Sequence, residues 1–202
     1  MKICIIDYGM GNITSVKNAL IHLKYDVTLV SEADKVAAYD IVILPGVGAF
    51  AKAMEVLKER QLDSAIREAA ANGKIIIGIC LGMQLLLSRS FEFGETEGLN
   101  LVEGEVLPFE TDMELRVPHM GWNEASCTHT EFTELNGDYY FVHSFYCALK
   151  NQEDVLFTTE YGIKYCSGLK HGEKVFGFQF HPEKSQRLGI SLLNKTLQYA
   201  QN

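Results

Sequence analysis

Cys80 has the clearest capacity for chemistry in this chain, because glycines bracket it in the stretch GICLG, residues 78–82. The apolar run KIIIGI at 74–79 predicts a buried strand, and LGMQLLL at 81–87 predicts the start of a helix. A cysteine in such a sharp turn lies at a helix amino end, where unpaired N–H groups favour a thiolate and can hold an oxyanion. On this motif alone, a buried structural cysteine with chance glycine neighbours is an equally good interpretation.

A thiolate that attacks a carboxamide needs a proton donor for the departing ammonia, and His181 is the best candidate. It ends the run VFGFQF at 175–180 and is followed by Pro182 and Glu183. The proline ends strand pairing, and the first and third side chains of an extended tripeptide point the same way. Glu183 can therefore orient the imidazole, as the third member of a catalytic triad does. The alternative is a strand-ending histidine beside a solvated glutamate.

The remaining histidines and cysteines have simpler interpretations. His22, His129 and His171 fall in surface or polar stretches and are expected to be solvated, whereas His119 and His143 fall in aromatic or apolar strands and are structural or pocket residues. The other four cysteines are expected to be small buried hydrophobes. The five cysteines have irregular spacing and no CxxC pair, so neither a disulfide framework nor a metal site is predicted.

The first half of the chain alternates strands with helices. Short isoleucine-rich or valine-rich runs predict strands at 2–7, 26–30, 40–45 and 74–79. Apolar residues at helical spacing predict helices at about 13–24, around 53–57 and at about 62–72. This alternation predicts a parallel sheet covered on both faces. Ligands bind outside the carboxyl ends of such strands, so the loop at 46–48 and Cys80 are expected to face one pocket.

The second half is rich in tyrosine, phenylalanine and valine, with glycine between the runs, which is typical of antiparallel hairpins. Strands are predicted at 104–109, 116–123, 139–149, 154–161, 165–172 and 175–181, and an amphipathic helix at about 185–199. The expected fold class is α/β, with a mainly parallel central sheet flanked by helices and an antiparallel, strand-rich second half. We expect a single domain over residues 1–202.

Composition excludes several classes of function. The formal net charge is -8 and the basic residues are scattered, which argues against a nucleic-acid groove or an anionic membrane face. The amino end, MKICIIDYG, lacks the long apolar stretch of a secretory signal, and no apolar run is long enough to cross a bilayer. A cytoplasmic location is expected.

Six motifs, spread over the chain from one end to the other, resemble those of the class I, or triad, glutamine amidotransferases. They are IIDYGMGN at 5–12, LPGVGAF at 44–50, GICLGMQLL at 78–86, VPHMGWN at 117–123, YFVHSFY at 140–146 and FQFHPEKS at 178–185. Within this family, DYGMGN and VPHMGWN are most similar to the glutaminase subunits of imidazole glycerol phosphate synthases. The resemblance covers nearly the whole sequence and keeps the family's order.

The resemblance implies a role for each matching residue. Cys80 would be the nucleophile, His181 the general acid and base, and Glu183 its orienting partner. The implied glutamine-binding and oxyanion-hole residues are Gly46, Val47, Gly48, Leu81, Gln84, His143, Ser144 and Phe145. The implied partner-interface residues are Asn12, Trp122, Tyr140 and Lys184, although Trp122 could simply be an aromatic in a half-buried strand. No metal or organic cofactor is implied.

The resemblance also implies a partner, a separate cyclase subunit with a (β/α)8 barrel, which forms a heterodimer with the glutaminase and consumes its ammonia. We expect the isolated chain to hydrolyse L-glutamine slowly. The nearest alternative is the glutaminase of another amidotransferase, for pyridoxal phosphate or anthranilate synthesis. A stand-alone cysteine hydrolase and a catalytically inactive binding subunit are more distant alternatives.

Overall fold

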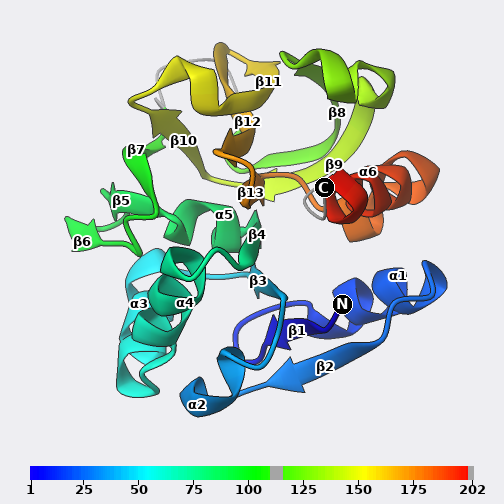
Figure 1. The fold of residues 1–202 in the computed structure, drawn as a ribbon. Helices are drawn as coiled ribbons and strands as arrows, with labels where there is room; N and C mark the ends of the chain where they lie inside the picture. The colour runs from blue at the N-terminus through cyan, green and yellow to red at the C-terminus, as the bar shows by residue number, and fades with distance from the viewer. Residues whose placement is uncertain (110–115, 200–202) are drawn as a thin grey trace.

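The computed structural model describes residues 1–109 and 116–199. In the first half, strands and helices alternate as the sequence predicts (Figure 1). The elements are β1 (Ile3–Ile6), α1 (Ile13–His22), β2 (Val27–Val30), α2 (Ala33–Val36), β3 (Ile41–Gly46), α3 (Phe50–Glu59), α4 (Leu62–Ala71) and β4 (Ile75–Cys80).

The second half is rich in strands. After α5 (Leu81–Leu85), the strands are β5 (Leu87–Ser90), β6 (Thr96–Glu97), β7 (Val102–Pro108), β8 (His119–Cys127), β9 (Gly137–His143), β10 (Phe145–Leu149), β11 (Val155–Tyr161), β12 (Ile163–His171) and β13 (Val175–Phe178). Short 3-10 helices occur at Thr130–Leu135, Gln152–Asp154 and Pro182–Lys184, and helix α6 (Gln186–Tyr199) follows.

The strands form one mixed sheet in the order β2-β1-β3-β4-β13-β12-β10-β7-β5-β6. The first five strands are parallel, and β12, β10 and β7 continue antiparallel. Strands β11, β8 and β9 extend from β12 as an antiparallel branch. The expected fold class, parallel at its centre and antiparallel in its second half, is therefore confirmed.

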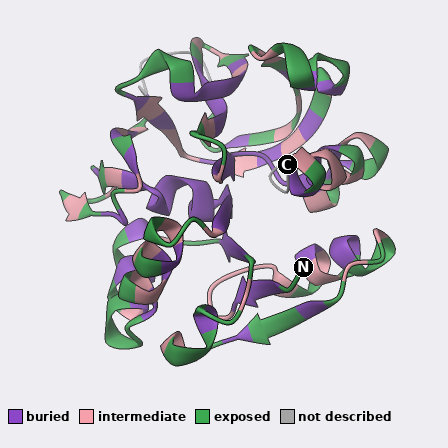
Figure 2. Ribbon diagram, in the orientation of Figure 1, coloured by how far each residue is buried: buried purple, intermediate pink, exposed green. Residues whose placement is uncertain are grey.

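Both faces of the central sheet are covered, which explains the continuous apolar runs of its strands. Every residue of β1, β3 and β4 is buried, and Figure 2 shows these strands in purple. Helices α2, α3 and α4 pack on one face, whereas α1, α6 and the β8–β9 hairpin pack on the other. No helix of the described residues is long and apolar enough to span a membrane.

Two expected elements differ in the structure. The helix expected over 81–87 ends at Leu85, because Leu87 begins β5 and pairs with Val102 of β7. A short apolar run fits a buried strand as well as a helix, and pairing with a distant segment decided the outcome. The strand expected over 139–149 is interrupted at Ser144, where β9 ends and β10 begins.

Candidate active site

Cys80 ends β4 in a strained backbone conformation, with φ 56° and ψ -114°. Positive φ is uncommon for a residue other than glycine, and such strain clusters at functional sites. Helix α5 begins at the next residue, so the turn has the geometry of a nucleophile elbow. The close packing explains the flanking glycines: a Cβ at Gly78 would lie 2.6 Å from the carbonyl oxygen of Gly82.

His181 reaches the same edge of the sheet from a neighbouring strand. Strand β13 runs parallel to β4, and Phe178 pairs with Ile79, so both strands end side by side. The His181 N–H donates to the Tyr140 carbonyl at 2.9 Å, which fixes the backbone beyond β13. Parallel pairing therefore brings a histidine about one hundred residues along the chain next to the elbow.

The side chains of His181 and Glu183 form a buried pair, with 2% and 1% of their surface exposed. Nδ1 of His181 lies 2.8 Å from Oε1 of Glu183. The other ring nitrogen, Nε2, is buried without a hydrogen-bond partner among the described residues, and so can take up and release a proton. Burial lowers the pKa of His181, but Cys80 and the Glu183 carboxylate outweigh burial and raise the pKa to about 10.

This pair predicts how stability depends on pH. The folded-state pKa of His181, about 10, exceeds the ordinary value of 6.5, so the folded protein holds the proton more tightly than the unfolded chain. The stabilisation is complete below about pH 6.5 and is lost as the pH rises toward 10. Because Glu183→Gln removes part of the shift, its free energy of unfolding should fall less over this interval. Urea unfolding at several pH values measures the free energy of unfolding of the wild type and of Glu183→Gln. If this free energy fell equally with pH in both proteins, Glu183 would not be the partner that raises the pKa of His181.

A pocket of about 540 Å³ opens beside the elbow. It is lined by Val47, Gly48, Cys80, Leu81, Gln84, Glu92, Phe93, Pro118, Val142, His143, Ser144 and Phe145. It gathers seven of the eight residues expected to bind glutamine or an oxyanion, from three separate motifs. The eighth, Gly46, does not line the pocket: it is buried at the end of β3, where it pairs with Cys80 of β4.

A cysteine, a buried histidine–carboxylate pair and a pocket are thus assembled from segments distant in sequence. A model of the family described as glutamine amidotransferase class-I matches residues 4–198. The chain belongs to the class-I glutamine amidotransferases.

Relatives of this amidotransferase carry a more specific name. A protein of Moorella thermoacetica named imidazole glycerol phosphate synthase subunit HisH is 47% identical, over 95% of this chain and 91% of its own length. A protein of the same name from Sulfurimonas denitrificans is 44% identical over 98% of both chains. The structure of PurLQS from Thermotoga maritima has the same fold, with a TM-score of 0.76 and 21% identity over 98% of both chains.

Three of the four residues expected at a partner interface lie together on the amidotransferase. Trp122 and Tyr140 pair across β8 and β9, with ring centroids 6.1 Å apart. The Lys184 ammonium lies 5.8 Å from the centre of the Tyr140 ring. Trp122 is 49% exposed, and Met120, two residues earlier on the same face of β8, is 63% exposed. Asn12 comes immediately before α1, a helix that contacts the 3-10 helix carrying Lys184.

Sequence reasoning missed four pocket residues of this amidotransferase: Glu92, Phe93, Pro118 and Val142. Pro118 and Val142 lie within two of the six motifs but were given no role. A Glu92 carboxylate oxygen accepts the N–H of Phe50 at 2.6 Å, at the amino end of α3. Phe93 is 93% exposed and has a φ of 55°. Glu92 and Phe93 follow β5, which begins at the last residue of the run expected to be helical, 81–87, and no sequence pattern placed them at the pocket.

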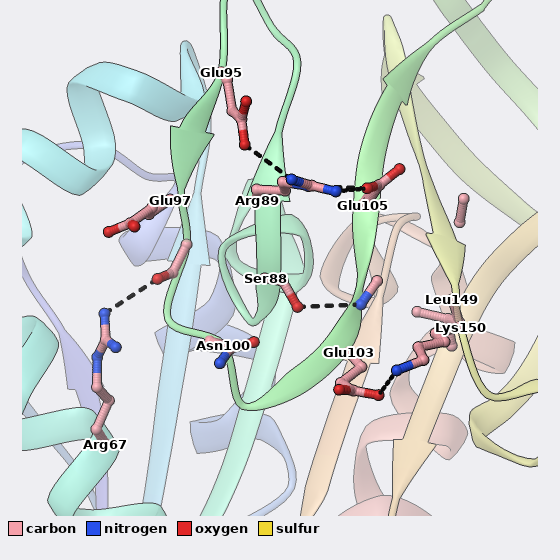
Figure 3. A pocket seen from close by; sticks show the side chains of 13 residues that line it. Arg67, Ser88, Arg89, Glu95, Glu97, Asn100, Glu103, Glu105, Leu149 and Lys150 are labelled. Carbon is pink, nitrogen blue, oxygen red and sulfur yellow. Dashed lines mark hydrogen bonds and ion pairs between the residues drawn. The ribbon is translucent and has the colours of Figure 1, made fainter.

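A second, larger hollow of about 760 Å³ lies along β5, β6, β7 and β10 (Figure 3). Its cations are engaged within it: Arg89 pairs with Glu95 and Glu105, Lys150 pairs with Glu103, and Arg67 donates to the Gly98 carbonyl. The hollow is therefore a surface of mixed charge, whose cations are already paired with neighbouring groups. Among residues 1–109 and 116–199, no group of three or more His, Cys, Asp or Glu side chains is placed to hold a metal ion.

Proposed function

We propose that this chain is the glutaminase subunit of an imidazole glycerol phosphate synthase. It hydrolyses L-glutamine and passes the ammonia to a cyclase subunit. The observation that carries the proposal is the buried His181–Glu183 pair beside a cysteine on a strained turn, in a chain 47% identical to a relative of that name.

The reaction follows from the roles we propose for these side chains. The Cys80 thiolate attacks the side-chain amide carbon of glutamine, and the C–N bond breaks as His181 gives a proton to the departing ammonia. The glutamyl group remains on the sulfur as a thioester. His181 then takes a proton from water, whose oxygen attacks the thioester and releases glutamate. Glu183 holds Nδ1 and so directs Nε2 to these proton transfers.

The oxyanion formed in each step needs hydrogen-bond donors. Leu81 begins α5 directly after the nucleophile, so its N–H is free of helical bonding and is a suitable donor. The loop of Val47 and Gly48 lines the same pocket and is the proposed source of a second donor. Each well-placed donor lowers the barrier by about 3 kcal/mol in comparable sites.

Among the pocket-lining residues of the described ranges, Glu92 alone has a carboxylate, and we assign it to the α-ammonium group of glutamine. Glu92→Gln keeps an oxygen that can accept the Phe50 N–H but removes the charge. We expect a KM for glutamine about 10- to 100-fold higher, because a hydrogen bond to a charged group is lost. Steady-state kinetics with glutamine as the varied substrate measures this KM. Glu95→Gln, which alters a nearby exposed ion pair, is the control; equal KM values for both variants and the wild type would contradict the assignment.

Ammonia released into water would be protonated and lost, so its consumer must be docked to this chain. We propose a cyclase with a (β/α)8 barrel, forming a heterodimer through the face that carries Met120, Trp122, Tyr140 and Lys184. Aromatic residues and methionine are enriched in such interfaces. The cyclase would convert the phosphoribulosyl form of a formimino-aminoimidazole-carboxamide ribotide (PRFAR) to imidazole glycerol phosphate and an aminoimidazole carboxamide ribotide (AICAR).

The test mixes the chain with this cyclase, glutamine and PRFAR. Glutamate and imidazole glycerol phosphate should form in equal amounts, with slow glutamine hydrolysis when the cyclase is omitted. Fast hydrolysis without any partner would contradict the coupling. Parallel mixtures with the pyridoxal phosphate and anthranilate synthases test the alternative, since ammonia transfer to either of them would overturn the proposed pathway.

A further inference from the structure

A row of hydrogen bonds, exposed at its start and buried around His119 and Tyr165, leads from strand β8 to the pocket beside Cys80. It begins at Asn123, whose side chain is held at both ends: Nδ2 donates to the Glu160 carbonyl at 3.0 Å, and Oδ1 accepts the Glu124 N–H at 2.8 Å. The second hydrogen of Nδ2 therefore points at Nε2 of His119, 3.2 Å away. This nitrogen of His119 must accept, so the proton of a neutral His119 lies on Nδ1.

The far end of the row is fixed in the same way. Nδ1 of His143 lies 2.8 Å from the Phe145 carbonyl oxygen. A carbonyl can only accept, so Nδ1 carries the proton and Nε2 of a neutral His143 is an acceptor. Burial lowers the pKa of His119 to about 4 and that of His143, against a weaker opposing effect of the Phe145 carbonyl, to about 3, so both rings are neutral at pH 7.

Tyr165 joins the two histidines. Its hydroxyl lies 3.1 Å from Nδ1 of His119 and 3.1 Å from Nε2 of His143. Nδ1 of His119 also lies 3.2 Å from Nε2 of His143. With both ends fixed, hydrogen bonds can run only from His119 toward His143: His119 donates to the hydroxyl or directly to His143, and the hydroxyl donates to His143. The His119 ring is also held between two rings, stacked at 3.9 Å on Tyr161 and at 4.6 Å on Phe141.

The row ends on pocket residues. The Phe145 carbonyl that accepts from His143 also accepts from Nε2 of Gln84, at 3.1 Å. The same amide nitrogen donates to Oε1 of Gln179 at 3.0 Å, and Nε2 of Gln179 lies 3.9 Å from the sulfur of Cys80. Both amide hydrogens of Gln84 are therefore committed, so Oε1 is the atom that Gln84 presents to the pocket.

We propose that His119 and Tyr165 are positioning residues for glutamine: they hold His143 in its Nδ1–H form, which fixes the Phe145 carbonyl and, through it, the Gln84 amide. Neither residue lines the pocket. The inference rests on the proposed function, because glutamine is the ligand that the pocket would hold. It also connects the pocket to β8, the strand that carries the exposed Met120 and Trp122.

The test replaces Tyr165 with phenylalanine and assays the chain together with the cyclase. Tyr165→Phe keeps the ring and removes one of the two donors near Nε2 of His143, the other being Nδ1 of His119. We therefore expect KM for glutamine to rise about threefold, and about tenfold when His119→Phe removes the second donor as well. The kcat should change less than about threefold, because Cys80 and His181 are untouched. Tyr161→Phe is the matched control: it keeps the stack on His119 and loses a hydroxyl that donates to the Arg116 carbonyl outside the row.

A second measurement is independent of catalysis. The ¹⁵N chemical shifts of the His143 ring should show one neutral form protonated at Nδ1 in the wild type, and a mixture of both forms in the double variant that combines His119→Phe with Tyr165→Phe. An unchanged KM in Tyr165→Phe, an equal rise in KM for Tyr161→Phe, or an unchanged ring form in the double variant would each overturn the proposal. Failure of the wild type to hydrolyse glutamine would instead reject the proposed function, and the chemical shifts would still test the hydrogen bonds.

Discussion

Replacing Cys80 with alanine is expected to lower glutamine hydrolysis by about 10⁴- to 10⁶-fold, the loss seen when a nucleophile is removed from a comparable catalytic unit. Without the sulfur no thioester can form, so the proton transfers by His181 have no covalent intermediate to serve. The measurement is glutamate release in the presence of the cyclase and PRFAR. The fold should survive, because alanine is smaller than cysteine. It loses the long contacts of the sulfur with the Val142 carbonyl and the Gln179 amide, both 3.9 Å, and the interaction of the sulfur with His181.

Cys166 provides a matched control. It is a second buried cysteine, on β12, and burial raises the pKa of its thiol to about 12, so it stays protonated and inert. Cys166→Ala should keep near wild-type turnover while losing some stability through the small cavity it leaves. Activity in Cys80→Ala, or an equal loss in both variants, would contradict the assignment of the nucleophile.

Gly82→Ala is expected to prevent stable folding. A Cβ at position 82 would lie 1.7 Å from the carbonyl oxygen of Leu44 on β3, a backbone atom held in the centre of the sheet. To relieve this clash, α5 would have to move away from β3 and β4. That movement would disrupt the packing that forms the turn at Cys80. We expect a loss of more than about 4 kcal/mol in the free energy of unfolding, a large part of the stability of an ordinary domain.

Gly11→Ala separates this effect from the general cost of replacing glycine. A Cβ there would meet its nearest atom, on the Pro45 side chain, at an ordinary contact distance of 3.5 Å. Thermal unfolding followed by circular dichroism compares the two variants. A melting temperature within a few degrees of wild type for Gly11→Ala, and no cooperative transition for Gly82→Ala, is the expected result. A folded Gly82→Ala would show that the elbow is less tightly packed than described here.

Local sequence patterns predicted the elements that depend on neighbouring residues in the chain, namely the parallel strands, their helices and the turn at Cys80. Isoleucine-rich runs and helical spacing identified the parallel half of the sheet, since strands covered on both faces need continuous apolar residues. Glycines on both sides of Cys80 predicted the sharp turn, and the structure supplies the reason in the close approach of Gly78 to Gly82 and of Gly82 to Leu44.

Features that depend on distant partners could not be predicted in this way. The run after Leu85 became β5 because β7 was available to pair with it, and this pairing placed Glu92 and Phe93 at the pocket. His171, expected to be solvated, is 48% exposed but lies 3.0 Å from a carboxylate oxygen of Asp154. The contact of His119 with Tyr165 joins β8 of the antiparallel branch to β12 of the main sheet, and no spacing within either strand indicates it.

Covalent labelling of the nucleophile tests the central claim most directly. The chain, bound to its cyclase, is incubated with 6-diazo-5-oxo-L-norleucine, a glutamine analogue whose diazoketone alkylates an activated thiolate. Intact-mass and peptide mass spectrometry then locate the adduct. We predict one adduct per chain, on Cys80, competed by glutamine and strongly slowed in His181→Gln. Labelling at another cysteine, or labelling of Cys80 that glutamine does not compete, would contradict the account.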